Sequence, residues 1–238
     1  MLSLTWHRLL VFVVHMARNN RRRADTVVVL DFETTGLSPN GGDRAIEIGA
    51  VRIEQGRITD RFQSLMNPGM RINYFIENYT GISNTMLKAA PPCRAVMTEF
   101  VEFIEDFDMV AHNASFDSRF LMAELRRIGR ESPGEFACSM LAARRLYQDA
   151  PNHKLGTLVA FHQLPNDGTF HRALADAEMT SHLWLKMLAD ISHKYQVEPV
   201  SFSLMQALTR TPKSAVSRLL KEWGAKYKQP AQAESAGL

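Results

Sequence analysis

Residues 27–37 read Val-Val-Val-Leu-Asp-Phe-Glu-Thr-Thr-Gly-Leu, so an apolar run passes directly into two acidic residues. A short, continuous apolar run is typical of a strand that is buried on both faces of its sheet. Because side chains alternate along a strand, Asp31 and Glu33 would point to the same face if the strand continues past Leu30. In α/β sheets, ligands bind outside the carboxyl ends of strands. This stretch therefore predicts a buried strand that delivers two carboxylates to a binding site.

The periodicity of the rest of the chain predicts a mixed α/β layer fold. Residues 26–30 form the first predicted strand, and residues 45–54 and 57–66 form an antiparallel hairpin. Strands and helices then alternate, which is typical of parallel strand pairs. The later predicted strands are 109–111 and 136–138, and the predicted helices are 95–106, 116–128, 140–147, 155–162 and 172–193.

Segments of different character flank this region. Residues 1–24 are expected to form an N-terminal helical extension, whose apolar run at 9–14 is far shorter than the roughly 20 residues that span a bilayer. Residues 196–238 are expected to form a basic helical tail with short helices at 201–208 and 212–227. We interpret its basic residues as a solvated face. The alternatives are that they steer a nucleic-acid backbone, or that the apolar stripe around Trp223 docks on a partner.

Composition sets only broad limits on function. The 238 residues carry 28 Lys and Arg against 25 Asp and Glu, a net charge of +3, with 45% hydrophobic and 22% charged residues. These values are typical of an ordinary globular protein and exclude a disordered or membrane-embedded chain. Cys93 and Cys138 are too few for a disulfide framework or a zinc site, so a reducing cytoplasm is the expected location.

Two further segments place acidic residues at predicted strand ends or helix starts. The second segment reads His112-Asn113-Ala114-Ser115-Phe116-Asp117 and the third reads His171-Arg172-Ala173-Leu174-Ala175-Asp176. Asp117 and Asp176 fall in the first turn of predicted helices, where the helix dipole alone would favour a negative charge. His112 is expected to make a structural hydrogen bond. Solvation is the expected role of three other carboxylates: Glu47, Glu124 and Glu178.

Considered together, the three segments indicate a metal site. Hard divalent cations prefer oxygen ligands, and several carboxylates gathered without cations would repel one another. Four carboxylates and a histidine, far apart in sequence and placed at element ends, are what a two-metal phosphodiester-cleaving site requires.

In order, spacing and inner residues, the three segments resemble the three motifs of the DEDDh 3′→5′ exonuclease family, which includes the proofreading epsilon subunit of bacterial DNA polymerase III. The resemblance covers about residues 26–190. His171, five residues before Asp176, matches the histidine branch of that family rather than the tyrosine branch. The resemblance implies a ribonuclease H-like mixed five-stranded sheet flanked by helices, which we assign to residues 25–195.

The resemblance also implies roles for individual residues. Two Mg²⁺ or Mn²⁺ ions would be held by Asp31, Glu33, Asp117 and Asp176, and His171 would take the proton from the attacking water. The implied substrate contacts are Thr34, Thr35, Gly36, Leu37, Asn113 and Ser115, with Leu37 as a wedge against the terminal base. One segment departs from the family pattern: many relatives carry His-Gly-Ile where this chain has Thr80-Gly81-Ile82.

The implied activity is hydrolysis of single-stranded DNA from its 3′ end to nucleoside 5′-monophosphates, in proofreading or repair. Trimming of RNA 3′ ends is the alternative, because none of the motifs reads a 2′-hydroxyl. A non-catalytic accessory or nucleic-acid-binding subunit is disfavoured, since all five site residues are present. A DNA polymerase subunit is the candidate protein partner, and no membrane span is expected.

Overall fold

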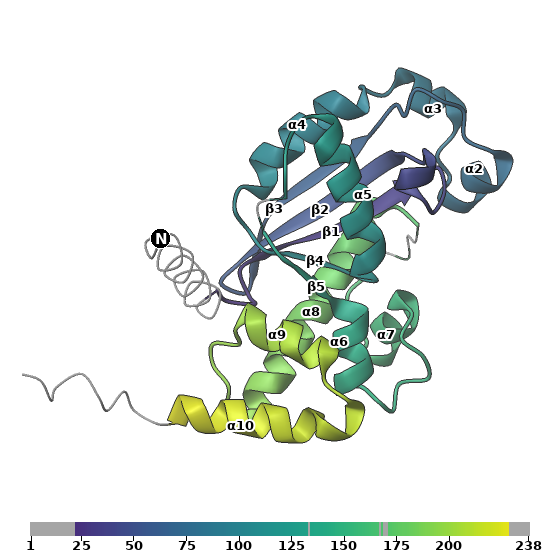
Figure 1. Ribbon diagram of the computed structural model, residues 1–238. Coiled ribbons are helices and arrows are strands. Elements are labelled where there is room, and N and C mark those ends of the chain that lie inside the picture. Colours follow the sequence, from purple (N-terminus) through teal and green to yellow (C-terminus); the bar gives the residue numbers. More distant parts are fainter. Residues whose placement is uncertain (1–21, 133, 167, 169–170, 229–238) are drawn as a thin grey trace, which may run out of the picture.

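The computed structural model describes residues 22–132, 134–166, 168 and 171–228 (Figure 1). One five-stranded mixed sheet has the order β3-β2-β1-β4-β5. The pairs β1–β2 and β2–β3 are antiparallel, whereas β1–β4 and β4–β5 are parallel. The strand bounds are β1 Val27–Thr34, β2 Ala45–Glu54, β3 Arg57–Leu65, β4 Met109–Ala111 and β5 Phe136–Cys138. The predicted mixed five-stranded sheet with one antiparallel hairpin is therefore confirmed.

Helices cover both faces of this sheet (Figure 1). Val28, Leu30 and Phe32 of β1 pack in a cluster with α4 (Cys93–Ile104) and α5 (Ala114–Arg127). The alternate residues Val27 and Val29 pack in a second cluster, with α8 (Ala173–Tyr195). Because side chains alternate along β1, Asp31 and Glu33 point to the α8 face.

Four helices surround α8 on its side of the sheet: α6 (Ser139–Leu146), α7 (Leu155–Phe161), α9 (Phe202–Arg210) and α10 (Val216–Lys228). Phe202, Leu208 and Leu220 are fully buried in the cluster that α8 forms, and Trp223 packs against it. The apolar stripe of α10, which the docking alternative would use, thus packs against the core of the protein. The domain boundary at residue 196 remains a prediction, and the N-terminal extension lies almost entirely outside the described residues.

The main difference from the sequence prediction lies between β3 and α4, where the sequence predicts a loop. Two short helices occupy it, α2 (Tyr74–Thr80) and α3 (Asn84–Ala89), with Asn73 and Ser83 as N-caps. Ile76 packs against a small separate cluster that contains Ile72 and Ile82. Helices this short show too few turns for a periodic pattern. Two 3-10 turns, η1 (Pro39–Gly41) and η2 (Lys213–Ala215), complete the elements.

Among the described residues, no helix is both long enough and apolar enough to cross a membrane.

Candidate active site

The first pair of site carboxylates lies on β1, which runs four residues past its predicted end to Thr34. In the register with β2, Asp31 is opposite Gly49 and Glu33 is opposite Glu47. A Cβ at Gly49 would lie 2.1 Å from the backbone nitrogen of Leu174, so only glycine admits the first turn of α8 there. This close approach places the beginning of α8 directly beside Asp31 and Glu33.

Asp117 reaches the site from the other side of β1. The short strand β4 pairs with β1 at Val28 and Val29, and β1 continues beyond it. The backbone N–H of Phe32 donates a hydrogen bond to Asp117 Oδ1 at 3.2 Å. Asn113, in the left-handed region with a φ of 85°, turns the chain from β4 into α5. The sharp turn after a short parallel strand therefore brings the first turn of α5 against the end of β1.

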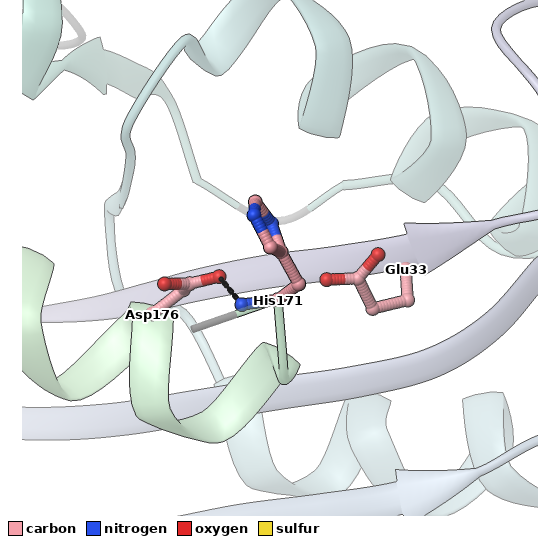
Figure 2. Close-up of side chains that lie close together, drawn as sticks. All are labelled: Glu33, His171 and Asp176. Carbon is pink, nitrogen blue, oxygen red and sulfur yellow. Dashed lines mark hydrogen bonds between the residues drawn. The ribbon is translucent and has the colours of Figure 1, made fainter. Parts of the chain in front are cut away.

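His171 and Asp176 come from the start of α8 (Figure 2). His171 has a left-handed backbone with a φ of 59°, and its N–H donates to Asp176 Oδ2 at 3.1 Å. The exposed imidazole lies between the carboxylates of Glu33 and Asp176, and one ligand atom of each of the three residues lies within 4.8 Å of the others. A left-handed conformation is uncommon outside glycine and is often found at functional sites.

Burial raises the pKa of all four carboxyl groups. Burial is the largest cause for Asp31, whose pKa lies well above its ordinary value, with the charges of Asp117 and Asp176 adding to it. The pKa of Glu33 rises to about 8, that of Asp117 to about 7 and that of Asp176 to about 6. A dominant helix dipole would lower the pKa of Asp117 and Asp176. Both pKa values are raised instead, so the helix dipole alone does not account for carboxyl groups at these positions.

The donor set fits hard divalent cations. Four carboxylates supply the oxygen ligands that Mg²⁺ and related ions prefer, and cationic charge would offset their desolvation and mutual repulsion. Arg172, whose charge lowers the pKa of Glu33, is already paired with Glu47. The site therefore carries more negative charge than its own side chains balance.

These pKa shifts predict that the stability of the metal-free protein falls as pH rises. The folded state binds the carboxyl protons more tightly than the unfolded chain does, so the stabilisation is complete below pH 4 and is lost through pH 6 to 8. In EDTA the thermal midpoint should drop across this range, by about 2–4 °C for each kcal/mol lost. Asp117→Asn, which keeps the acceptor for Phe32, should flatten the decline, and Mn²⁺ should reverse it most at pH 8. A midpoint in EDTA that rises from pH 6 to 8 would contradict the assigned direction.

Glu47 is not solvated, which corrects the expectation for this residue. Its side chain is fully buried, and Arg172 donates to both carboxylate oxygens at 2.8 and 3.1 Å. The N–H of Ala173 and the amide of Gln63 donate to it at 3.2 and 2.9 Å. Glu47 therefore ties the N-terminus of α8, between His171 and Asp176, to strand β2.

Glu124 is likewise buried rather than solvated. Arg44 donates to both of its oxygens at 2.8 and 2.9 Å, and Arg127 donates at 3.0 Å. Glu178 is partly exposed and pairs with Arg61. The ion pair with Arg44 holds the Glu124 carboxylate in the core. Because Arg44 is distant from Glu124 in the sequence, no local sequence pattern shows this pair.

Arg172→Leu should destabilise the protein, because it leaves the buried Glu47 carboxylate without its cation. The expected loss is about 3 kcal/mol, the lower end for breaking a buried ion pair, since the Arg172 side chain is 35% exposed. Urea unfolding measures the loss. The double variant Glu47→Gln/Arg172→Leu should recover most of it, because the uncompensated charge is gone. Equal losses in the single and double variants would show that the ion pair is not the cause.

The expected substrate contacts surround the end of β1. The Thr34 hydroxyl donates to the carbonyl of Gly36 at 2.6 Å, and the Thr35 hydroxyl donates to Asp43 at 3.1 Å. Both hydroxyls thus stabilise the turn, while Leu37 beside them is 76% exposed. Of the second segment, Asn113 and Ser115 are exposed at the start of α5 and bond to each other. The contact of all six residues with substrate remains a prediction.

The structural role expected for His112 is confirmed. Its Nδ1 lies 2.9 Å from the Ser139 hydroxyl and its Nε2 lies 3.0 Å from the carbonyl of His153. Burial lowers the pKa of His112 to about 4, so the ring is neutral at physiological pH.

The sequence patterns do not predict one aromatic residue that lies at the site. The Tyr79 ring lies 4.1 Å from the His171 ring, centroid to centroid. Thr80, at the departure from the family pattern, is buried and bonds to its own helix at Ile76. In the sequence, the one indication that Tyr79 belongs to the site is its position next to Thr80. No sequence pattern links α2 to α8.

Comparisons with known proteins give a consistent result. A model of the family described as Exonuclease matches residues 28–183. The chain is 41% identical over 161 residues to a PolC-type DNA polymerase III of Caldanaerobacter subterraneus subsp. tengcongensis, which covers 68% of this chain and 11% of that protein. It is 41% identical over 162 residues to the 3′-5′ exonuclease DinG of Bacillus subtilis, covering 68% and 17%. The chain thus spans less than a fifth of the length of both relatives.

Solved structures share the fold. Exonuclease X in complex with 5′ overhanging duplex DNA superposes with a TM-score of 0.60 and 26% identity, covering 77% of this chain and 99% of that one. The nuclease domain of 3′hExo, a DEDDh family member bound to rAMP, has a TM-score of 0.60 at 19% identity, covering 70% and 92%. The predicted ribonuclease H-like fold is thereby confirmed.

Proposed function

We propose that this chain, which belongs to the exonuclease family, hydrolyses single-stranded DNA stepwise from the 3′ end and releases nucleoside 5′-monophosphates. One observation carries the proposal. Carboxylates from three segments, Asp31 and Glu33 on β1, Asp117 on α5 and Asp176 on α8, converge with His171 at the carboxyl end of one strand. The DinG relative, named a 3′-5′ exonuclease, supports the direction of hydrolysis.

The four carboxylates would hold two Mg²⁺ or Mn²⁺ ions. When bound, such a pair of cations activates a water and stabilises the charge on the attacking and leaving oxygens. Asp31 and Glu33 are held by the pairing of β1 with β2, and Asp117 by its hydrogen bond to Phe32. Rigid strand and helix ends therefore preorganise the ligands, which limits the reorganisation needed at each turnover.

His171 acts as the general base in this proposal. Its backbone is anchored to Asp176, whereas its imidazole is exposed beside Glu33 and open to water. Imidazole accepts and releases protons readily near neutral pH, which suits it to take the proton from the attacking water.

The terminal nucleotide would lie against the end of β1, where Leu37 projects into solvent. In this position Leu37 wedges against the terminal base, and the backbone of Thr34, Thr35 and Gly36 approaches its sugar and phosphate. Asn113 and Ser115 contact the same strand from the start of α5. A DNA polymerase subunit is the proposed partner, in keeping with the PolC-type relative, and the cytoplasm is the proposed location.

The test uses 5′-labelled single-stranded DNA and RNA of one sequence with Mg²⁺, Mn²⁺ or EDTA. A ladder that shortens stepwise from the 3′ end in the presence of metal is the expected result, with DNA degraded faster than RNA. Hydrolysis that persists in EDTA, or products from internal cuts alone, would refute the proposal. A faster rate on RNA would redirect it to RNA trimming.

A further inference from the structure

An exposed row of aromatic rings leads away from His171 along α2. Phe75 and Tyr79 are four residues apart and therefore share one face of the helix. Their rings are stacked, with centroids 5.8 Å apart and planes 11° from parallel. The Tyr79 ring in turn lies 4.1 Å from the His171 ring. Phe75 is 69% exposed and Tyr79 is 51% exposed, so each ring presents aromatic surface to solvent.

The opposite side of α2 anchors this row to the protein. Ile76 packs against the small apolar cluster, and its N–H is capped by the side chain of Asn73. The Glu77 carboxylate accepts a hydrogen bond from the N–H of Asn84 at 2.6 Å. The exposed rings therefore project from a helix that is held on its inner face, and they do not need to be ordered by a ligand.

The inner end of the row belongs to the reaction centre. The Tyr79 ring lies 4.1 Å from the ring of His171, and a ligand atom of His171 lies within 4.8 Å of the carboxylates of Glu33 and Asp176. A chain whose end is held at those carboxylates must leave the site along an adjoining surface. Tyr79 is such a surface, and Phe75 continues it outward.

We propose that Tyr79 and Phe75 form a stacking surface for the bases of single-stranded DNA next to the terminal nucleotide. This inference rests on the proposed function. Bases of a single strand have free π faces that stack on aromatic side chains irrespective of sequence, whereas bases within a duplex already stack on their neighbours. The surface thereby favours unpaired 3′ ends without reading their sequence.

The first experiment measures kcat/KM on short 5′-labelled single-stranded DNA for Phe75→Ala. The expected loss is about 5- to 150-fold, as for removal of one base–aromatic stack. Phe75→Trp should retain the wild-type value, whereas Phe75→Leu, which is apolar but not aromatic, should not. Phe161→Ala is the matched control, because Phe161 is an exposed aromatic residue on α7 with 41% exposure. It should behave as wild type.

The second experiment places a base-free sugar at successive positions from the 3′ end. At the position that stacks on Phe75, the missing base should slow the wild-type enzyme, and Phe75→Ala should cause no further loss. If the wild-type enzyme releases no 3′ nucleotides at all, the proposed function fails. If the wild-type enzyme is active, two results would refute the stacking surface alone. Either Phe75→Ala has the wild-type kcat/KM, or Phe75→Ala lowers kcat/KM equally at every base-free position. The aromatic face would then be left for contact with a protein.

Discussion

Asp31→Asn is expected to lower kcat/KM on single-stranded DNA by more than about 100-fold. Residues that only hydrogen-bond to metal ligands cost up to about 100-fold when mutated, and loss of a ligand should cost more. Burial and the charges of Asp117, Asp176 and Glu33 raise the pKa of Asp31. Replacing it with a neutral amide of the same shape removes ligand charge where the cations would sit. Release of labelled 3′ nucleotides at saturating Mn²⁺ measures the loss.

Stability measurements separate this effect from misfolding. Desolvation and neighbouring carboxylates raise the pKa of Asp31, so its negative charge destabilises the metal-free folded state. Asp31→Asn should therefore unfold in EDTA at a temperature no lower than wild type, and Mn²⁺ should raise its midpoint less. Asp60→Asn is the control, because Asp60 is an exposed carboxylate on β3 of the same sheet, and it should retain activity. Full activity of Asp31→Asn would remove this residue from the metal site.

His171→Ala is expected to lower kcat by about 10²- to 10⁴-fold, the usual contribution of a general base. The hydrogen bond from His171 to Asp176 uses the backbone N–H, so alanine preserves it and the metal ligands keep their places. The variant should therefore retain the Mn²⁺-induced rise in thermal midpoint while losing turnover. Single-turnover rates on labelled single-stranded DNA measure the change.

Added imidazole distinguishes a base from a positioning residue. If His171 takes the proton from water, free imidazole should restore part of the activity of His171→Ala and leave wild type unaffected. His193→Ala is the control, because His193 is exposed near the other end of α8. A kcat for His171→Ala within a few fold of wild type would assign proton removal to another group.

The strands, the long helices and the family could be predicted because local patterns carry them. The apolar run before Asp31 and the alternation in residues 45–54 identified β1 and β2, and the 3.6-residue period identified α4, α5 and α8. The three motifs pointed to the exonuclease family, which the match over residues 28–183 confirms. Each of these inferences used residues within one helix, one strand or one motif.

The errors arose where a residue's partner lies elsewhere in the chain. Glu47 reads as a solvated strand residue, yet Arg172, more than a hundred positions away, holds it in the core. The stripe around Trp223 leaves docking on a partner open as an alternative in the sequence, yet α10 packs it against the cluster around α8. Helix α2 is too short to show a period, so the sequence predicts a loop where Phe75 and Tyr79 lie.

The sequence by itself determined which side chains can perform the chemistry, since oxygen ligands and an imidazole in ordered motifs admit few alternatives. Only the tertiary structure decided how these side chains meet. Gly49 lets α8 approach β2, the Glu47–Arg172 pair secures its first turn, and Tyr79 comes to lie on His171. The reason is physical: ligand type is a property of each residue, whereas burial, charge and contact depend on neighbours that folding brings together from distant positions.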